Sequence, residues 1–304
     1  MDKKRNSKMI SKNNFTFKKR DLMSWLIMLP GIILFAFFVW APLIENIRLS
    51  VYSLKGLKIQ EFVGLENYIA VVNHPDFTAA FKNTFLYIAW SLIIGFLVPI
   101  MVAILICETT RLKGFFKAAA YFPSMIPGLA VTLIGSFFFA GGNNGVINIL
   151  IGKIGLAPQA WLSHGMWTIP IICILCTWRG FGGTALIYMA AISGINPELY
   201  EAATIDGAGI VRRITHIIVP SLKSIAKSML LLQIIAVFQI MYEPMILTNG
   251  GPNNASISVM LLVYNYAFGR YDFSKAAALS VMMSLVLILL SVFYSKMTKE
   301  KQEG

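Results

Sequence analysis

Residues 22–44 read LMSWLIMLPGIILFAFFVWAPLI, a run of 23 residues without a charged side chain. A helix needs about 20 apolar residues to cross the hydrocarbon core of a bilayer, where no water is present to bond backbone polar groups. The run is longer than the apolar core of a secretory signal peptide and is not followed by a small-residue cleavage site. We therefore expect a retained first membrane span.

The composition of the whole chain supports the same environment. Of its 304 residues, 57% are hydrophobic and only 13% are charged, and the mean hydropathy is +0.70. Soluble domains carry about 25% charged residues. The net charge of +12 would favour nucleic-acid binding in a soluble protein. Here the charges flank the apolar runs, so we predict a multi-spanning membrane protein with no nucleic-acid partner.

Six apolar runs are long enough to span a bilayer. They lie at about 22–44, 83–107, 118–140, 167–187, 228–247 and 276–294. Kinks or span ends are predicted at the prolines of positions 30, 42, 123, 127, 170 and 244. Between spans, residues 45–80 are expected to form a long external loop. The short apolar stretch 146–151 predicts an interfacial or re-entrant helix.

The distribution of Lys and Arg predicts the orientation, because cytoplasmic loops of membrane proteins are enriched in these residues. If the N-terminus is cytoplasmic, 18 basic residues fall inside and seven outside, with Arg179 left within a span. We therefore expect both termini in the cytoplasm, with a permease domain at 22–295 between two tails, residues 1–21 and 296–304. The basic N-terminal tail is expected to be disordered or to anchor to anionic lipid.

The cysteines and histidines predict no metal site. Cys107, Cys173 and Cys176 all lie in apolar stretches, and the last two form a lone C-x-x-C. Such a pair can indicate redox or metal chemistry, but no second pair and no nearby histidine accompanies it. The three histidines are spread over different segments. We expect reduced, packed thiols.

The loop between the fourth and fifth spans has the strongest local signals. Residues 195–220 read INPELYEAATIDGAGIVRRITHIIVP. Asn196 is a good N-cap, Pro197 suits the first helical position, and Gly207 can end the helix in a left-handed conformation. A second short helix is predicted at 210–218, before Pro220. On these signals alone, the first helix either docks a cytoplasmic partner or lies in the membrane interface.

The order Glu201-Ala202-Ala203, then Gly207, then a final Pro220 resembles the EAA loop of permeases from binding-protein-dependent ABC importers. In that family the loop is the coupling helix that docks in a cleft of the ATPase subunit. The resemblance implies that Glu201 is the charged contact to the ATPase, that the two alanines pack closely, and that Gly207 makes the turn. Asp206 and Pro220 complete the implied coupling segment, residues 195–220.

Other fragments resemble the carbohydrate-uptake branch of this family, of the maltose or glycerol-phosphate type. They are FVGLENY at 62–68, NT at 83–84, GVIN at 145–148, LTNGGP at 247–252 and the stretch 264–280. The resemblance covers roughly residues 22–295. Val219 stands where the family usually has Leu, and the stretch at 141–144 lacks an expected tryptophan.

The resemblance implies an all-α membrane protein with six transmembrane helices and a cytoplasmic coupling helix, the permease fold of type I ABC importers. It further implies a bacterial cytoplasmic-membrane complex with a second, different permease subunit, two ATPases and an extracytoplasmic sugar-binding protein. The chain has no Gly-rich phosphate loop, since Gly152-Lys153 is followed by Ile154 rather than Ser or Thr. ATP and Mg²⁺ are therefore expected only in the partner ATPases, and this chain is expected to be neither an enzyme nor a cofactor protein.

Polar side chains within the spans are candidates for the sugar path, because ionisable groups at membrane depth are expensive and usually functional. They are Gln233, Gln239, Tyr242, Glu243, Asn249 and Arg179. Glu243 is the best of them, although it lies near the outer end of the fifth predicted span and could reach water. Arg179 either lines the path or makes a structural ion pair or carbonyl contact. With a single intramembrane Arg, a neutral sugar is favoured over glycerol phosphate.

Two other classes of protein remain to be weighed. A secondary transporter driven by an ion gradient would need paired broken helices or several intramembrane carboxylates, and Glu243 alone gives little support. An intramembrane enzyme would need a catalytic constellation within the spans, and none is recognisable. A capped cytoplasmic loop has no role in either class.

Overall fold

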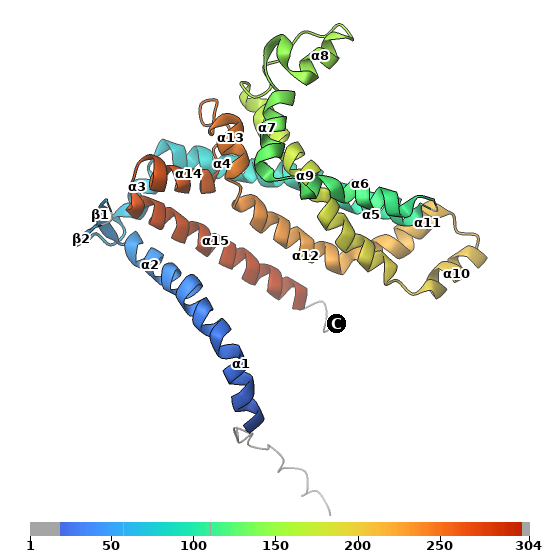
Figure 1. Ribbon diagram of the computed structural model, residues 1–304, viewed down its shortest axis with the longest axis horizontal. Helices are drawn as coiled ribbons and strands as arrows, with labels where there is room; N and C mark the ends of the chain where they lie inside the picture. The colour runs from blue at the N-terminus through green and yellow to red at the C-terminus, as the bar shows by residue number, and fades with distance from the viewer. Residues whose placement is uncertain (1–18, 57, 110, 300–304) are drawn as a thin grey trace, which may run out of the picture. The chain divides into compact units, whose positions relative to one another are not determined.

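The computed structural model describes residues 19–56, 58–109 and 111–299, and the chain divides into two units, residues 1–48 and residues 49–304 (Figure 1). Residues 1–18 of the predicted basic tail and residues 300–304 of the C-terminal tail lie outside the described residues. The two units are described separately below.

The first unit is the predicted first span. It contains α1 (Lys19–Phe35), a π-helical turn η1 (Ala36–Trp40) and most of α2 (Ala41–Ser50). Together they form one apolar helix over Met23–Ser50, which extends beyond the predicted 22–44. Pro42 lies directly after the π turn. A proline lacks an N–H and crowds the carbonyl four residues earlier, and a wider turn accommodates both effects without ending the helix.

The second unit begins with a small structured region in place of the long loop predicted at 45–80. An antiparallel hairpin of β1 (Tyr52–Lys55) and β2 (Lys58–Phe62) is followed by α3 (Glu66–Val72). The Asn67 side-chain amide donates to the carbonyls of Ser50 (2.9 Å) and Tyr52 (3.0 Å), which fixes the hairpin against α3. This hairpin is an addition to the predicted all-α fold.

Four further apolar helices of the second unit are long enough to cross a bilayer. The first combines α4 (Pro75–Trp90), the π turn η2 (Ser91–Gly95) and α5 (Leu97–Glu108). The second is α9 (Gly165–Ser193). The third runs continuously through α11 (Ile210–Arg213), η5 (Ile214–Ile218) and α12 (Val219–Phe238). The fourth is α15 (Phe273–Lys299). With the first unit, the described residues hold five such helices.

The third predicted span, 118–140, is sharply bent. It consists of α6 (Lys113–Tyr121), the 3₁₀ turn η3 (Phe122–Met125) and α7 (Gly128–Phe138), and the two halves meet at 92°. Pro123 and Pro127 lie in and after η3, as the proline positions predicted. Counting this bent pair as one span gives the predicted six.

Two predicted boundaries are wrong. The helix expected to stop at Ile218 continues through Pro220 to Phe238, because the π turn η5 directly precedes this proline, as η1 precedes Pro42. The fifth span, expected at 228–247, instead ends at Phe238, and a separate helix α13 (Tyr242–Thr248) follows. Pro244 lacks the N–H that would bond the Ile240 carbonyl in a continuous helix, and the Ser258 hydroxyl donates to that carbonyl instead (2.5 Å).

The remaining elements are short. The 3₁₀ turn η4 (Gly142–Asn144) and α8 (Val146–Gly152) lie between α7 and α9, and α14 (Val259–Tyr264) and the π turn η6 (Asn265–Gly269) precede α15. The α8 helix is the short apolar helix predicted at 146–151. Asn148 ties its loop together by donating to the carbonyls of Ala140, Gly142 and Gln159 and accepting from the Trp161 indole.

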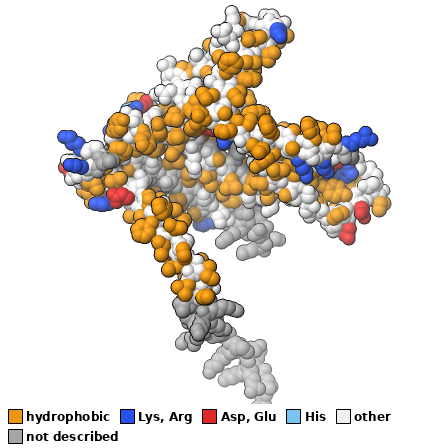
Figure 2. All heavy atoms as spheres, viewed as in Figure 1, with side chains coloured by type: hydrophobic (Ala, Val, Ile, Leu, Met, Phe, Trp, Pro, Cys, Tyr) orange, Lys and Arg blue, Asp and Glu red, His pale blue; other side chains and the backbone are white. Residues whose placement is uncertain are grey.

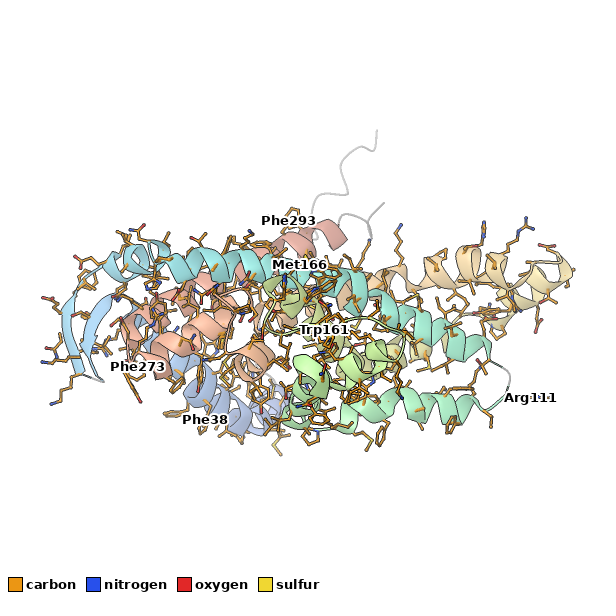
Figure 3. All side chains as sticks on the ribbon, turned by 90° about the horizontal axis from the view of Figure 1, so that it is seen from above. Phe38, Arg111, Trp161, Met166, Phe273 and Phe293 are labelled. Atoms are coloured by element: carbon orange, nitrogen blue, oxygen red, sulfur yellow. The ribbon has the colours of Figure 1, made fainter. Side chains whose placement is uncertain are left out.

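The core of the second unit is divided into three clusters along the helices. One joins α3 and α4 to α14 and α15, a second joins α4 to α9, and a third joins α5, α6, α9 and the start of α12. In Figure 1, α10 (Pro197–Ile205) lies at the opposite end of this unit from β1, β2 and α3. Figure 3 likewise places Arg111, in the turn before α6, at the opposite end from Phe273. Hydrophobic side chains cover much of the surface between these two ends, whereas Lys and Arg side chains gather at the ends themselves (Figure 2).

Candidate functional site

The predicted coupling loop folds as its local signals indicate. The Asn196 side-chain oxygen accepts from the Glu198 N–H (3.1 Å), which caps α10, and Pro197 occupies its first turn. At the other end Gly207 has φ +69°, and the Ala208 N–H returns to the Ala203 carbonyl (2.8 Å). Both ends of this one short helix are therefore closed by its own sequence.

The predicted coupling loop presents an exposed face. Glu201, Ala202 and Asp206 are exposed, and Ala203 is half-buried. Large apolar side chains at the tip are also exposed, with Ile205 at 87% and Val211 at 75%. Exposed apolar groups beside small residues are typical of a surface that another protein covers.

Pro220 lies apart from the other predicted coupling residues. It belongs to the continuous helix that starts at Ile210, ten residues before it, while Glu201 to Gly207 form α10 and its final turn. An ion pair between Arg213 and Glu108 (3.0 Å) ties the start of this helix to the end of α5.

Burial and the nearby Glu108 carboxylate raise the pKa of the Tyr200 phenol on α10.

A cavity of about 300 Å³ opens among the spans of the second unit. Side chains of α4, η2, α5, α9, α12 and α13 line it. The polar and aromatic ones are Tyr87, Ser91, Thr177, Phe181, Thr184, Gln233, Gln239 and Glu243. Hydroxyls and amides bond sugar hydroxyls, and aromatic faces stack on sugar rings, so this lining suits an uncharged saccharide.

Three of the predicted pathway residues come together in this cavity. The Gln233 amide donates to the Ser91 hydroxyl (2.5 Å), which joins α12 to η2, while Gln239 is exposed. Glu243 is the single charged residue in the lining. No ion pair to Glu243 occurs within the residues that the structure describes.

The other three predicted pathway residues lie elsewhere. Tyr242 begins α13 but does not line the cavity, and Asn249 ends α13 in a left-handed conformation on the surface. The Arg179 guanidinium donates to the Ile126 carbonyl (3.5 Å) at the bend between η3 and α7. The bend leaves this carbonyl outside a regular helix, so the geometry favours the carbonyl contact over pathway lining for Arg179.

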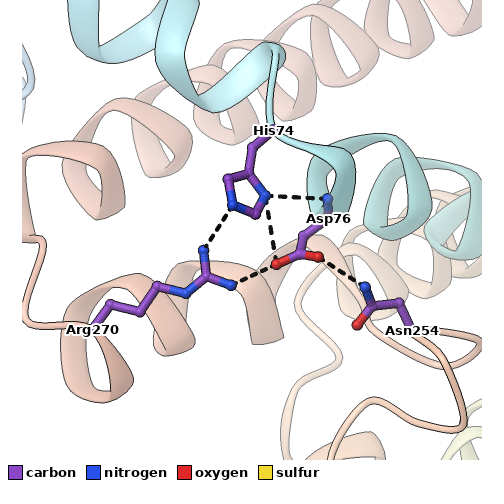
Figure 4. A network of polar contacts seen from close by, with 4 residues as sticks. All are labelled: His74, Asp76, Asn254 and Arg270. Carbon is purple, nitrogen blue, oxygen red and sulfur yellow. Dashed lines mark hydrogen bonds and ion pairs between the residues drawn. The ribbon is translucent and has the colours of Figure 1, made fainter.

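A polar network at the start of α4 fixes the segment that follows α13 (Figure 4). Asp76 accepts from Asn254 (2.8 Å) and pairs with Arg270, which also contacts His74. Two turns further along α4, Asn83 donates to the carbonyls of Asn254 (2.7 Å) and Ile257 (3.0 Å). Together these residues hold the loop after α13 against α4.

Sequence reasoning missed several of these residues. Tyr87, Ser91, Thr177 and Thr184 line the cavity, and Asp76 anchors the loop after α13. The sequence signal that could have revealed some of them is a spacing of seven residues along one helix. Thr177 and Thr184 are seven residues apart, so they share one face of a helix, as do Asp76 and Asn83. The free Cys173 and Cys176 also line the cavity, which agrees with the expected reduced thiols.

Comparison with known proteins identifies the family. Residues 95–299 match the family described as "Binding-protein-dependent transport system inner membrane component". The chain belongs to this permease family. The match includes the predicted coupling loop, the bend at η3, and the α9, α12 and α13 walls of the cavity.

Individual relatives cover nearly the whole permease. It is 28% identical to the arabinooligosaccharides transport system permease protein AraP of Bacillus subtilis, over 95% of this chain and 92% of that protein. It is 30% identical to the polygalacturonan/rhamnogalacturonan transport system permease protein YteP of the same organism, over 91% of this chain and 87% of that protein. The permease is thus similar along its length to carbohydrate permeases.

Solved structures give the same result for the fold. The permease superimposes on a chain of a bacterial ABC transporter that imports the acidic polysaccharide alginate, with a TM-score of 0.84, 26% identity, and coverage of 93% of this chain and 96% of that one. A second structure shows that transporter in complex with a periplasmic protein bound to an alginate pentasaccharide, with a TM-score of 0.82. The fold predicted from the sequence is confirmed.

Proposed function

We propose that this permease forms part of the translocation pathway of an ABC importer for a neutral sugar or oligosaccharide, which an extracytoplasmic binding protein delivers. The observation that carries the proposal is the α10 helix, which is capped at both ends, exposed, and followed after the Gly207 turn by a helix that lines the polar cavity. A docked partner that moves α10 would act directly on the α12 wall of that cavity.

The proposed assembly contains four kinds of subunit. Two ATPases would bind ATP and Mg²⁺ and receive α10 in a cleft, with Glu201 as the charged contact. A second, different permease would supply the other half of the pathway, since the sequence resembles subunits that pair with an unlike partner. The binding protein would dock on the external loops. Both termini would lie in the cytoplasm, which is the orientation that the basic residues favour.

The mechanism is alternating access. ATP binding would close the two ATPases and move their α10 helices, and rigid-body motion of the permeases would open the cavity to the outside. ATP hydrolysis would return it to the inward-facing state. In this scheme the chain itself holds no nucleotide and catalyses no reaction.

Co-purification with the candidate ATPase tests this proposal. We expect Glu201→Arg and Gly207→Glu to abolish the complex, or its coupled ATPase activity, while membrane insertion is retained. Glu61→Arg is the matched control, because Glu61 is exposed on β2 at the opposite end of the unit. If the wild type binds no ATPase, or if uptake persists in cells stripped of ATP and stops when the ion gradient collapses, the proposal is wrong.

The cavity supports a neutral substrate. The unpaired Glu243 carboxylate would repel an acidic saccharide such as alginate, but it can accept hydrogen bonds from sugar hydroxyls. Hydrogen bonds to charged groups contribute about 1.5–3 kcal/mol each.

Substitution of Glu243 tests this substrate class. We expect Glu243→Ala to lower uptake of the oligosaccharide that the wild type imports by about 10- to 100-fold, with Glu243→Gln retaining part of it. Tyr242→Phe is the control, because Tyr242 is adjacent but does not line the cavity. Unchanged uptake in Glu243→Ala would remove Glu243 from the pathway without affecting the ATPase-docking proposal.

A further inference from the structure

A second hollow lies between α5 and the first half of α12, and we call it the inner groove. Its volume is about 570 Å³, and it shares no lining residue with the cavity described above. Phe96, Ile100, Leu222 and Leu230 form apolar walls. The polar groups of its side chains are those of Lys223 and Lys227 alone.

The two lysines are arranged to act together. They are four residues apart on α12, which places them one turn apart on the same helix face. Lys223 is exposed and Lys227 is half-buried. Neither forms an ion pair with any Asp or Glu in the described part of the chain. Two neighbouring ammonium groups beside an apolar groove therefore lack a counter-charge.

The lysines lie where the helix passes from charged to apolar sequence. Arg213 pairs with Glu108 at the end of α5, and Lys223 is about 15 Å further along the same helix. Beyond Lys227, the rest of α12 contains no charged residue. A lysine at such a boundary extends its ammonium group toward the headgroups while its stem packs on apolar surface. In the proposed orientation this boundary is the cytoplasmic leaflet.

We propose that the inner groove binds an anionic phospholipid of the cytoplasmic leaflet. Lys223 and Lys227 would hold the lipid phosphate, and an acyl chain would lie along Phe96, Ile100 and Leu230. Basic pockets between membrane helices on this side recognise anionic headgroups. An apolar helix of the partner permease would instead bury two unpaired ammonium groups, which is costly. This proposal depends on the proposed function only for the orientation of the chain in the membrane. It does not depend on the docking of an ATPase or on the binding of a sugar.

Native mass spectrometry of the purified complex tests the site, with dioleoyl phosphatidylglycerol and dioleoyl phosphatidylcholine as probes. A basic residue near an anionic surface contributes about 1 kcal/mol, or about fivefold in affinity. We therefore expect K223Q/K227Q to lower the preference for phosphatidylglycerol by roughly 25-fold. K113Q/K117Q is the matched control, since it removes two exposed charges from α6 and should retain the preference.

A second variant separates the acyl site from a simple charge effect. Ala226→Trp fills the groove and leaves both lysines in place, so bound phosphatidylglycerol should be lost, and inorganic phosphate should not compete with it in the wild type. An unchanged lipid preference in K223Q/K227Q or in Ala226→Trp would overturn the proposal. So would efficient cross-linking of Ala226→Cys to the partner permease, in a background without the native cysteines, because a protein helix would then occupy the groove.

Discussion

Gly182 shows how one residue sets the distance between two helices. It is buried on α9 against α6, and a Cβ built on it would lie 2.7 Å from the Ala120 carbonyl carbon and 2.8 Å from the Tyr121 Cα. Both neighbours are backbone atoms, which cannot rotate away. The neighbouring Gly183 has nothing within 4 Å of the corresponding position. The α6–α9 contact beside the bend at η3 therefore depends on the absence of a side chain at Gly182.

Gly182→Ala should accordingly lower stability. Overpacking of a close contact costs about 1–3 kcal/mol, so we expect a reduced Tm of the purified complex. Gly183→Ala gains the same helix propensity on the same helix without a clash, and it should leave the Tm unchanged or slightly raised. Equal Tm values for the two variants would show that α6 can move away freely at this contact.

At the scale of an element, α10 depends on the left-handed conformation of Gly207. A residue with a Cβ pays about 1–2 kcal/mol for this conformation, even though the space around Gly207 is open. We expect Gly207→Ala to weaken ATPase binding by roughly 5- to 30-fold by fraying the end of α10. Gly209→Ala is the control, since Gly209 has φ −68° and open space. Equal ATPase affinity in both variants would contradict a role for the Gly207 turn.

The elements that sequence could predict are those whose signals are local. The cap at Asn196, the turn at Gly207 and the bend at Pro123 and Pro127 each depend on a few adjacent residues, and all were predicted. The end of α12 at Phe238 was not, because the sequence stays largely apolar on both sides of it, from 228 to 247. The break there is stabilised by Ser258, whose bond to the Ile240 carbonyl replaces the one that Pro244 cannot make.

The residues of the candidate sites also differ in whether local sequence signals were enough to predict them. Glu201 to Gly207 form one short helix, so their order along the chain was enough to place them together. The cavity is built from six helical elements, and hydropathy does not indicate which face of each span turns inward. Gln233, Gln239 and Glu243 were singled out because polar groups are rare at that depth, and all three line the cavity. For Arg179 the sequence left pathway lining and a structural contact open, because its carbonyl partner at Ile126 is available only once the bend has formed.

At the scale of the whole second unit, one helix connects the predicted coupling loop to the cavity. It starts at Ile210, directly after the Gly207 turn, and reaches the cavity at Gln233, where it bonds Ser91. Near its start, Arg213 is half-buried with Glu108 of α5, and its Nε atom is buried without a hydrogen-bond partner among the residues that the structure describes. Because α5 and α12 both line the cavity, the Glu108–Arg213 pair is positioned to make them move as one body.

Charge substitutions at this pair should uncouple the two sites. Arg213→Glu places two carboxylates together at a half-buried position, where loss of one partner costs roughly 3–5 kcal/mol. We expect basal ATPase activity of the complex to persist while substrate-dependent stimulation and uptake fall. The reversed pair Glu108→Arg/Arg213→Glu restores the attraction and should recover much of the stimulation. If Arg213→Glu couples normally, motion reaches the cavity without this contact. If the reversed pair fails while its Tm matches the wild type, the orientation of the charges matters in itself.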